Sequence, residues 1–537
     1  MNNGYRFLLI IALAGIVSGG CKKNFLETKS TEKVDEEVIF RDTKTALAAV
    51  NGLHKLMWTA DLSTTAFYGG YDMLMIWYEV MGEDLVYTYS NAQFQTQAQW
   101  ATHRKPTVGS VEHFYRLLQY FVTNANMIIN RVDDLEGPQS EKDNIKGQAL
   151  FYRAFGYFTM VQMYGERYRP GGNNTQLGIV LRNDNSTEPR ARATVEEVYQ
   201  QINNDLDAAI QALEATSVER PNKSHINVHV ARGLKARVLL TQGKWLEAAQ
   251  MAKLVVEQSG AQLQADTYTT VNNRFSDQAN TEWLWGSKPL LAQGKQLTHF
   301  HGYMSNENVS YNQNTPRAIY NLLYNRISGT DVRKSIWFPM AVVPSVTPRP
   351  LVPPSTNSKY ANYMANKFIV TDPQTIGERD IPFMRLPEMM LVEAEGYARA
   401  GGHDAEAADA LYPLAHQRDP DYQRSVNSGE NLIDEIMFQR RVELWGEGFR
   451  FLDLKRLNMP LDRGAAPRPG YNQGNWSNSM TSMPVNVDPL ASNFNMYGNG
   501  TVIGEANRYR AADSNDWQWV LPESEIQLNP LCVQNPL

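Results

Sequence analysis

The sequence predicts a mainly α-helical protein in which tetratricopeptide-like hairpins form a frame that carries long irregular loops and few short strands. Apolar residues recur at three- and four-residue steps in most long segments, which is the period of a helix with one buried face. A short string also occurs in two related copies, GKWLEAA at 243–249 and GHDAEAA at 402–408, each between two helix-like segments. The intervals 260–380 and 460–516 are instead rich in Asn and Pro, which favours loops.

The composition limits the class of function. The chain has 537 residues, 42% of them hydrophobic, so it can bury a large core. Its net charge is -6 and it has no basic block, which argues against a nucleic-acid-binding surface. The cysteines are Cys21 and Cys532, so a disulfide framework is excluded. Phosphate-loop, nucleophile-elbow and zinc-protease motifs are missing from the sequence, and no cofactor or metal is expected.

The N-terminus reads as a lipoprotein signal. In residues 1–20 an apolar run, Phe7–Val17, follows a short polar start, and this run is too short to cross a bilayer as a helix. The run leads into Ser-Gly-Gly-Cys, which resembles a lipoprotein box, so we expect a lipid on Cys21 and a polar tether over residues 21–36. The alternative is an ordinary secreted protein in which Cys21 has no special role. If Cys21 is acylated, Cys532 remains as a free thiol.

The rest of the chain, 37–537, is expected to form a single body of frame and loops. The frame is expected at about 37–58, 109–260 and 385–457, and loop-rich, ligand-binding sections at about 59–108, 261–384 and 458–516. Within the frame, 143–164 is apolar nearly all round and predicts a central helix that ends at Gly165. Thr194 and Glu197 have the spacing of a capping box, which predicts a helix start.

The two repeated strings mark helical hairpins. The first hairpin is predicted from helices over 227–243 and 244–258, and a helix over 388–400 opens the second. Glycine at each turn, followed by alanines, is what closely packed tetratricopeptide-like helices require.

Residues 431–457 combine an apolar helical stripe with dense charge. Charges beside Trp and Phe side chains are expected to be half-buried, and a buried charge has to be paired. We therefore predict a structural ion network that ties the last helices to the loop-bearing half and contains Arg440, Glu443, Glu447, Arg450 and Asp453. The alternative is an acid/base pair among Glu443, Glu447 and Asp453, but no candidate nucleophile accompanies them.

The same segment resembles a family signature. QRRVELWGEGFRFLDLKR at 439–456 is similar to the C-terminal signature of the SusD/RagB family of bacterial outer-membrane nutrient-binding lipoproteins, which often has Glu where this chain has Gln439. Three further strings resemble family motifs in the expected order: GQALFYRAFGYFTMVQMYG at 147–165, RATVEEVYQQINNDLDAAI at 192–210 and the tail at 517–537.

The resemblance implies a SusD-like fold, in which the repeats form a right-handed superhelical frame. It further implies a cell-surface lipoprotein that binds an oligosaccharide nutrient and delivers it to a SusC-like TonB-dependent outer-membrane transporter, without catalysis. A peptide ligand, as in RagB-like relatives, is an alternative. Two further alternatives are a repeat scaffold that binds only proteins and a surface glycoside hydrolase with a hidden carboxylate pair.

Aromatic side chains in the loop sections are the candidates for ligand contacts. Flat rings stack on the apolar faces of sugars, and nearby amides satisfy the hydroxyls. On placement alone, the candidates are Tyr71, Trp77, Tyr78, Trp100, Trp283, Trp285, Tyr303 and Tyr311. For each ring, packing in the core is the alternative, most of all for Trp77 with its apolar neighbours.

Overall fold

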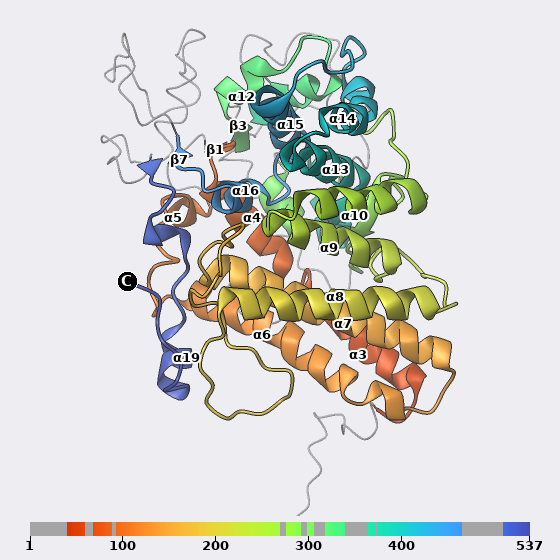
Figure 1. The fold of residues 1–537 in the computed structure, drawn as a ribbon, viewed down its shortest axis with the longest axis vertical. Coiled ribbons are helices and arrows are strands. Elements are labelled where there is room, and N and C mark those ends of the chain that lie inside the picture. The colour runs from red at the N-terminus through yellow and green to blue at the C-terminus, as the bar shows by residue number, and fades with distance from the viewer. Residues whose placement is uncertain are drawn as a thin grey trace, which may run out of the picture.

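A computed structural model confirms the mainly helical class. It describes residues 40–59, 68–87, 93–268, 275–290, 298–305, 317–338, 363–370, 373–463 and 509–537. The predicted signal, Cys21 and the predicted tether lie outside these residues. Successive helices stack from α3 at one end to α14 and α15 at the other (Figure 1). None of the helices in the described ranges combines the length and the apolar character that spanning a bilayer requires.

The N-terminal half of the stack is built around one buried helix. This helix, α7 (Gln139–Tyr164), packs against α3 (Thr43–Leu56), α6 (Gly109–Ile129) and α8 (Val195–Ala215). Its burial agrees with the all-round apolar pattern of the sequence, and it ends at Gly165, as predicted. The predicted capping box is confirmed, since Thr194 Oγ1 accepts from the backbone N–H of Glu197 at 3.2 Å and the Glu197 carboxylate accepts from the N–H of Thr194 at 2.8 Å.

The repeated strings lie at the turns of two hairpins that pack on each other. The hairpins pair α9 (Val228–Thr241) with α10 (Trp245–Gln258), and α13 (Leu386–Ala400) with α14 (Asp404–Arg418). Helix α13 packs on α10 at Gly396, where a Cβ would lie 2.6 Å from the carbonyl oxygen of Trp245. Only glycine fits so close an approach, which explains the small residues in these helices.

The charged segment forms a helix, a tight turn and a short helix. Helix α15 (Gly429–Glu443) is followed by residues 444–449, here called the signature turn, and by α16 (Arg450–Arg456). Gly446 and Gly448 have φ values of +80° and +87° within the turn. Helix α15 packs on α13 and α14, while α16 packs on α4.

The section 59–108 departs from the predicted loop. It contains α4 (Tyr71–Met81), which is buried along almost its whole length. Its Tyr71 and Trp77 contact rings of α7 and α6, and its Met75 lies against Gly448 in the signature turn. The sequence YDMLMIWYEVM is apolar on every side, so it lacks the three- and four-residue period of a surface helix, and its aromatic content favoured a loop. The remaining short helices are α5 (Gln95–Ala98), α11 (Phe300–Met304), α12 (Asn321–Arg326) and α19 (Glu523–Leu528), with 3-10 turns at Val132–Asp134, Val332–Ile336, Pro373–Glu378 and Asn515–Trp517.

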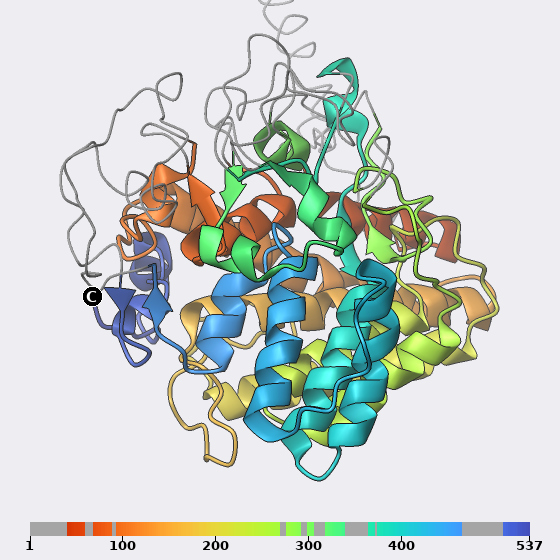
Figure 2. The same cartoon turned by 90° about the horizontal axis from the view of Figure 1, so that it is seen from above.

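The strands are few and short, as predicted. Four of them form an antiparallel sheet in the order β1 (Leu85–Tyr87), β3 (Arg317–Ile319), β5 (Met364–Ala365) and β4 (Trp337–Phe338). The described residues also contain two antiparallel pairs: β2 (Trp283–Gly286) with β6 (Pro382–Arg385), and β7 (Leu461–Asp462) with β8 (Tyr509–Arg510). Figure 2 shows the short green strands gathered on one side of the helical stack.

Candidate functional site

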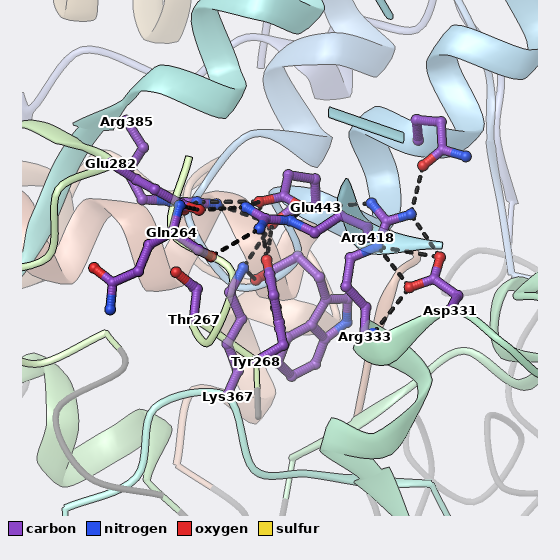
Figure 3. A network of polar contacts seen from close by, with 12 residues as sticks. Gln264, Thr267, Tyr268, Glu282, Asp331, Arg333, Lys367, Arg385, Arg418 and Glu443 are labelled. Carbon is purple, nitrogen blue, oxygen red and sulfur yellow. Dashed lines mark hydrogen bonds and ion pairs between the residues drawn. The ribbon is translucent and has the colours of Figure 1, made fainter. Parts of the chain in front are cut away.

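Glu443 stands at the centre of a buried charge network (Figure 3). It is the last residue of α15, and its side chain is 0% exposed. Its carboxylate meets Arg333 at 3.3 Å, Arg385 at 3.1 Å and Arg418 at 3.2 Å. Tyr268 adds a hydrogen bond from its hydroxyl to Oε1 at 3.0 Å. Four separate segments of the chain therefore meet at one carboxylate.

Glu447, in the signature turn, extends the network. Its carboxylate accepts from Lys367 Nζ at 2.6 Å and from Arg385 Nη2 at 2.6 Å. Lys367 also donates to the carbonyl oxygens of Glu443 and Trp445, each at 2.8 Å. One lysine thus holds residues 363–370 against the signature turn.

The charges in this cluster balance. Its core, here called the Glu443 network, contains four carboxylates and four cations: Glu282, Asp331, Glu443, Glu447, Arg333, Lys367, Arg385 and Arg418. Gln439 joins it through Oε1, which accepts from Arg333 Nη2 at 2.5 Å. A glutamate at 439 would add an uncompensated negative charge, so the departure from the family signature preserves neutrality in a buried site.

The pKa values keep the signature carboxylates ionised. Burial alone would raise the pKa of Glu443, but Arg418, Arg385 and Arg333 hold it well below its ordinary value. Arg385 and Lys367 likewise outweigh burial and lower the pKa of Glu447. Arg440 and Arg456 lower that of Asp453 to about 2 against the same burial effect. A general acid/base needs a pKa near the working pH, so this geometry favours the structural role over the acid/base alternative.

Two neighbouring clusters contain the other predicted charges. Asp453 pairs with Arg440 and Arg456, each at 2.8 Å, and Arg456 continues to Glu395 on α13. Arg450 pairs with Glu83, which directly follows α4. These pairs attach α16 to α13 on one side and to the α4–β1 connection on the other.

Glu79, which the sequence motifs do not mark, binds the backbone of the signature turn through its carboxylate. Its two carboxylate oxygens accept from the backbone N–H groups of Gly446 and Gly448, each at 2.9 Å. Burial raises the pKa of Glu79 to about 7, while the bond from Gly446 opposes that rise. The sequence signal for this role is an acidic residue inside the apolar run MLMIWYEVM. Such a residue is expected to be buried, and a buried charge requires hydrogen-bond partners.

Glu79→Ala is expected to lower the free energy of unfolding by about 2–4 kcal/mol, because it leaves two buried backbone N–H groups without an acceptor. Urea unfolding followed by circular dichroism measures the change. Glu430→Ala, on the exposed start of α15, is the matched control and should lower stability by no more than about 1 kcal/mol, since it removes only a charge at the helix N-terminus. Equal midpoints for both variants would contradict this role of Glu79.

The predicted ligand-binding rings do not converge on one surface. Those in the described residues lie in the core, except Tyr71, which is half-buried, and Tyr311 lies outside the described residues. Trp77 contacts Trp519 with ring centroids 5.0 Å apart, and Trp285 contacts Phe151 at 5.2 Å. The buried rings are Trp77, Tyr78, Trp100, Trp283, Trp285 and Tyr303. These placements match the core-packing alternative, and a stacking role stays a prediction.

The described part of the molecule contains a small cavity and a wider groove. A cavity of about 50 Å³ lies under the signature turn and is lined by Tyr71 and Tyr78 among others. A groove of about 590 Å³ runs between α8, α9 and α10. Its described lining is mostly amide and charged side chains, without an aromatic ring, so it offers no stacking surface for a sugar.

Comparison with known proteins extends over both ends of the chain. Residues 24–240 match a SusD-like family model described as "Starch-binding associating with outer membrane", and residues 345–537 match the model of the SusD family. SusD-like protein P2 of Formosa agariphila is 21% identical over 541 residues, which covers 92% of this chain and 99% of the relative.

Solved structures share the fold. A putative sugar-binding protein from Bacteroides vulgatus superposes with a TM-score of 0.72 at 22% identity, covering 92% of this chain and 98% of the other. Surface glycan-binding protein A from Bacteroides thetaiotaomicron, solved with laminarihexaose, gives a TM-score of 0.64 at 15% identity, covering 92% and 99%. With the two family models spanning most of the sequence, the chain belongs to the SusD/RagB family.

Proposed function

We propose that this protein is a lipid-anchored protein of the outer-membrane surface that binds an oligosaccharide and delivers it to a SusC-like TonB-dependent transporter. The observation that carries the proposal is the match of SusD family models to both ends of the chain. A relative with the same fold was solved with laminarihexaose, which supports a glycan as the ligand class.

The geometry supports binding rather than chemistry. The Glu443 network joins α14 and α15 to segments 275–290, 317–338 and 363–370, which belong to the section predicted to bind ligand. A binding loop needs a rigid base, and buried ion pairs at the ends of the loops provide one. The helical repeats remain free to supply the face that meets the transporter.

A binding panel tests the ligand class. The mature chain would be titrated calorimetrically with laminarihexaose, a maltooligosaccharide of similar length and a mixed oligopeptide. Saturable binding of an oligosaccharide is expected. Binding of the peptide alone would favour the RagB-like alternative. The appearance of shortened oligosaccharides in the calorimeter cell would favour a hydrolase. A pull-down that captures the transporter, together with no binding of any ligand in the panel, would favour a repeat scaffold that binds only proteins.

Cys21→Ala is expected to release the protein from the membrane fraction after signal removal, because the lipid is then lost. Cell fractionation followed by immunoblotting measures the shift. Cys532→Ala is the matched control: this thiol is free and buried, so its loss should leave the protein membrane-bound. Retention of Cys21→Ala in the membrane would contradict the lipid anchor.

A further inference from the structure

The cavity under the signature turn lies where six helices meet. Its walls come from α4, α7, α9, α13, α15 and α16, and the turn itself closes one side. Phe155, Leu234 and Val392 make the wall partly apolar, while Arg440 and Asp453 add charge. Its volume is about 50 Å³.

Two buried polar atoms on residues that line the cavity lack a hydrogen-bond partner among the described residues. They are the hydroxyl of Tyr78 and Nη1 of Arg440, on residues that are 1% and 4% exposed. Arg440 uses Nε for Asp453 at 2.8 Å, and its guanidinium lies over the ring of Phe449, 5.1 Å from the centroid. Nη1 is therefore left with no acceptor, and a buried donor in that state costs free energy.

The lining selects a small neutral ligand. Arg440 is already neutralised by Asp453, and Glu447 by Lys367 and Arg385, so an added ion would be uncompensated. Arg440 Nη1 can only donate, whereas the Tyr78 hydroxyl can donate and accept. Water can satisfy both atoms, and the cavity exceeds the roughly 10–15 Å³ that one water molecule needs.

We propose that this cavity is a structural water site that joins the Tyr78 hydroxyl on α4 to Arg440 Nη1 on α15. The water completes the hydrogen bonding of the junction that Glu79 forms between the same helix and the signature turn. A wall of apolar side chains alone would stay dry, whereas this lining also contains polar side chains, among them Tyr78 and Arg440 with their unpartnered atoms.

The sign of a stability change tests the site. Tyr78→Phe removes a group that is bonded to water under this proposal, so the melting temperature should fall by about 1 °C for a chain of this size. Tyr164→Phe is the matched control: its hydroxyl is also buried and unpartnered among the described residues, but Tyr164 does not line the cavity. Removing an unsatisfied hydroxyl should raise the melting temperature or leave it unchanged.

A crystal structure of the wild type at better than about 1.5 Å decides the matter directly. Water density within about 3.2 Å of both polar atoms, lost in part in Tyr78→Phe, is the expected result. A cavity without density, density for another solute, or a melting temperature that rises in Tyr78→Phe would overturn the proposal.

Discussion

Glu443→Ala is expected to lower the free energy of unfolding by about 3–5 kcal/mol, because removing one member of a buried ion pair leaves its partners uncompensated. Here three guanidiniums, of Arg333, Arg385 and Arg418, lose their shared carboxylate, and each of these side chains is at most 1% exposed. Urea unfolding followed by circular dichroism measures the loss, and thermal unfolding should show a lower melting temperature.

Two further variants separate charge from packing at this position. Glu443→Gln keeps the volume and the oxygen acceptor but removes the charge, so it should also be destabilising. The exposed Glu430→Ala removes a carboxylate from the same helix and should have little effect. A melting temperature of Glu443→Ala equal to that of the wild type would contradict the structural role of the Glu443 network.

Arg385→Met is expected to lower the free energy of unfolding by about 3–5 kcal/mol, because it removes a buried cation and leaves the carboxylates around it uncompensated. Arg385 donates to the carboxylates of Glu282, Glu443 and Glu447 at distances from 2.6 to 3.1 Å. Methionine fills much of the space but neutralises none of these charges. The free energy of unfolding at pH 7 measures the loss.

The pH dependence of this variant has a defined sign. In the folded wild type, the pKa values of Glu443 and Glu447 are lower than the ordinary glutamate pKa of about 4.3. The stability that these carboxylates contribute is therefore fully present above about pH 4.3. It is lost as the pH falls through their folded pKa values. Without Arg385 those pKa values rise. The difference between wild type and Arg385→Met should therefore shrink as the pH falls below about 4.3, and an equal difference at pH 7 and in acid would contradict this explanation.

The sequence predicts the frame well where the signal is local. Helix α7 follows from a run that is apolar nearly all round, and the start of α8 follows from the spacing of Thr194 and Glu197. The break between α15 and α16 follows from Gly446 and Gly448. Each of these features depends on residues that are close in the chain.

Features that depend on distant residues could not be predicted. The sequence indicated that Glu443 needs partners, but Arg333 and Arg385 lie 110 and 58 positions away, and many other arginines were available. The sequence pattern does not predict helix α4, because a helix buried on all sides has no amphipathic period. Its Glu79 therefore went unrecognised as the acceptor for the signature turn.

The burial of the described aromatic candidates could not be predicted for a similar reason. A tryptophan in a short buried strand such as β2 and a tryptophan in a binding loop have the same local composition. Only the pairing of Trp283 and Trp285 with β6 shows that both lie in the core.

We propose that the signature charges stabilise the frame and take no part in ligand binding. Glu447→Gln tests it most directly, because it removes one charge of the network while keeping the shape and an acceptor for Lys367 or Arg385. The variant would be titrated with the oligosaccharide identified by the binding panel, well below its melting temperature. We predict a lower free energy of unfolding, by about 1–3 kcal/mol, with a Kd equal to that of the wild type. A weakened Kd at unchanged stability would contradict the claim.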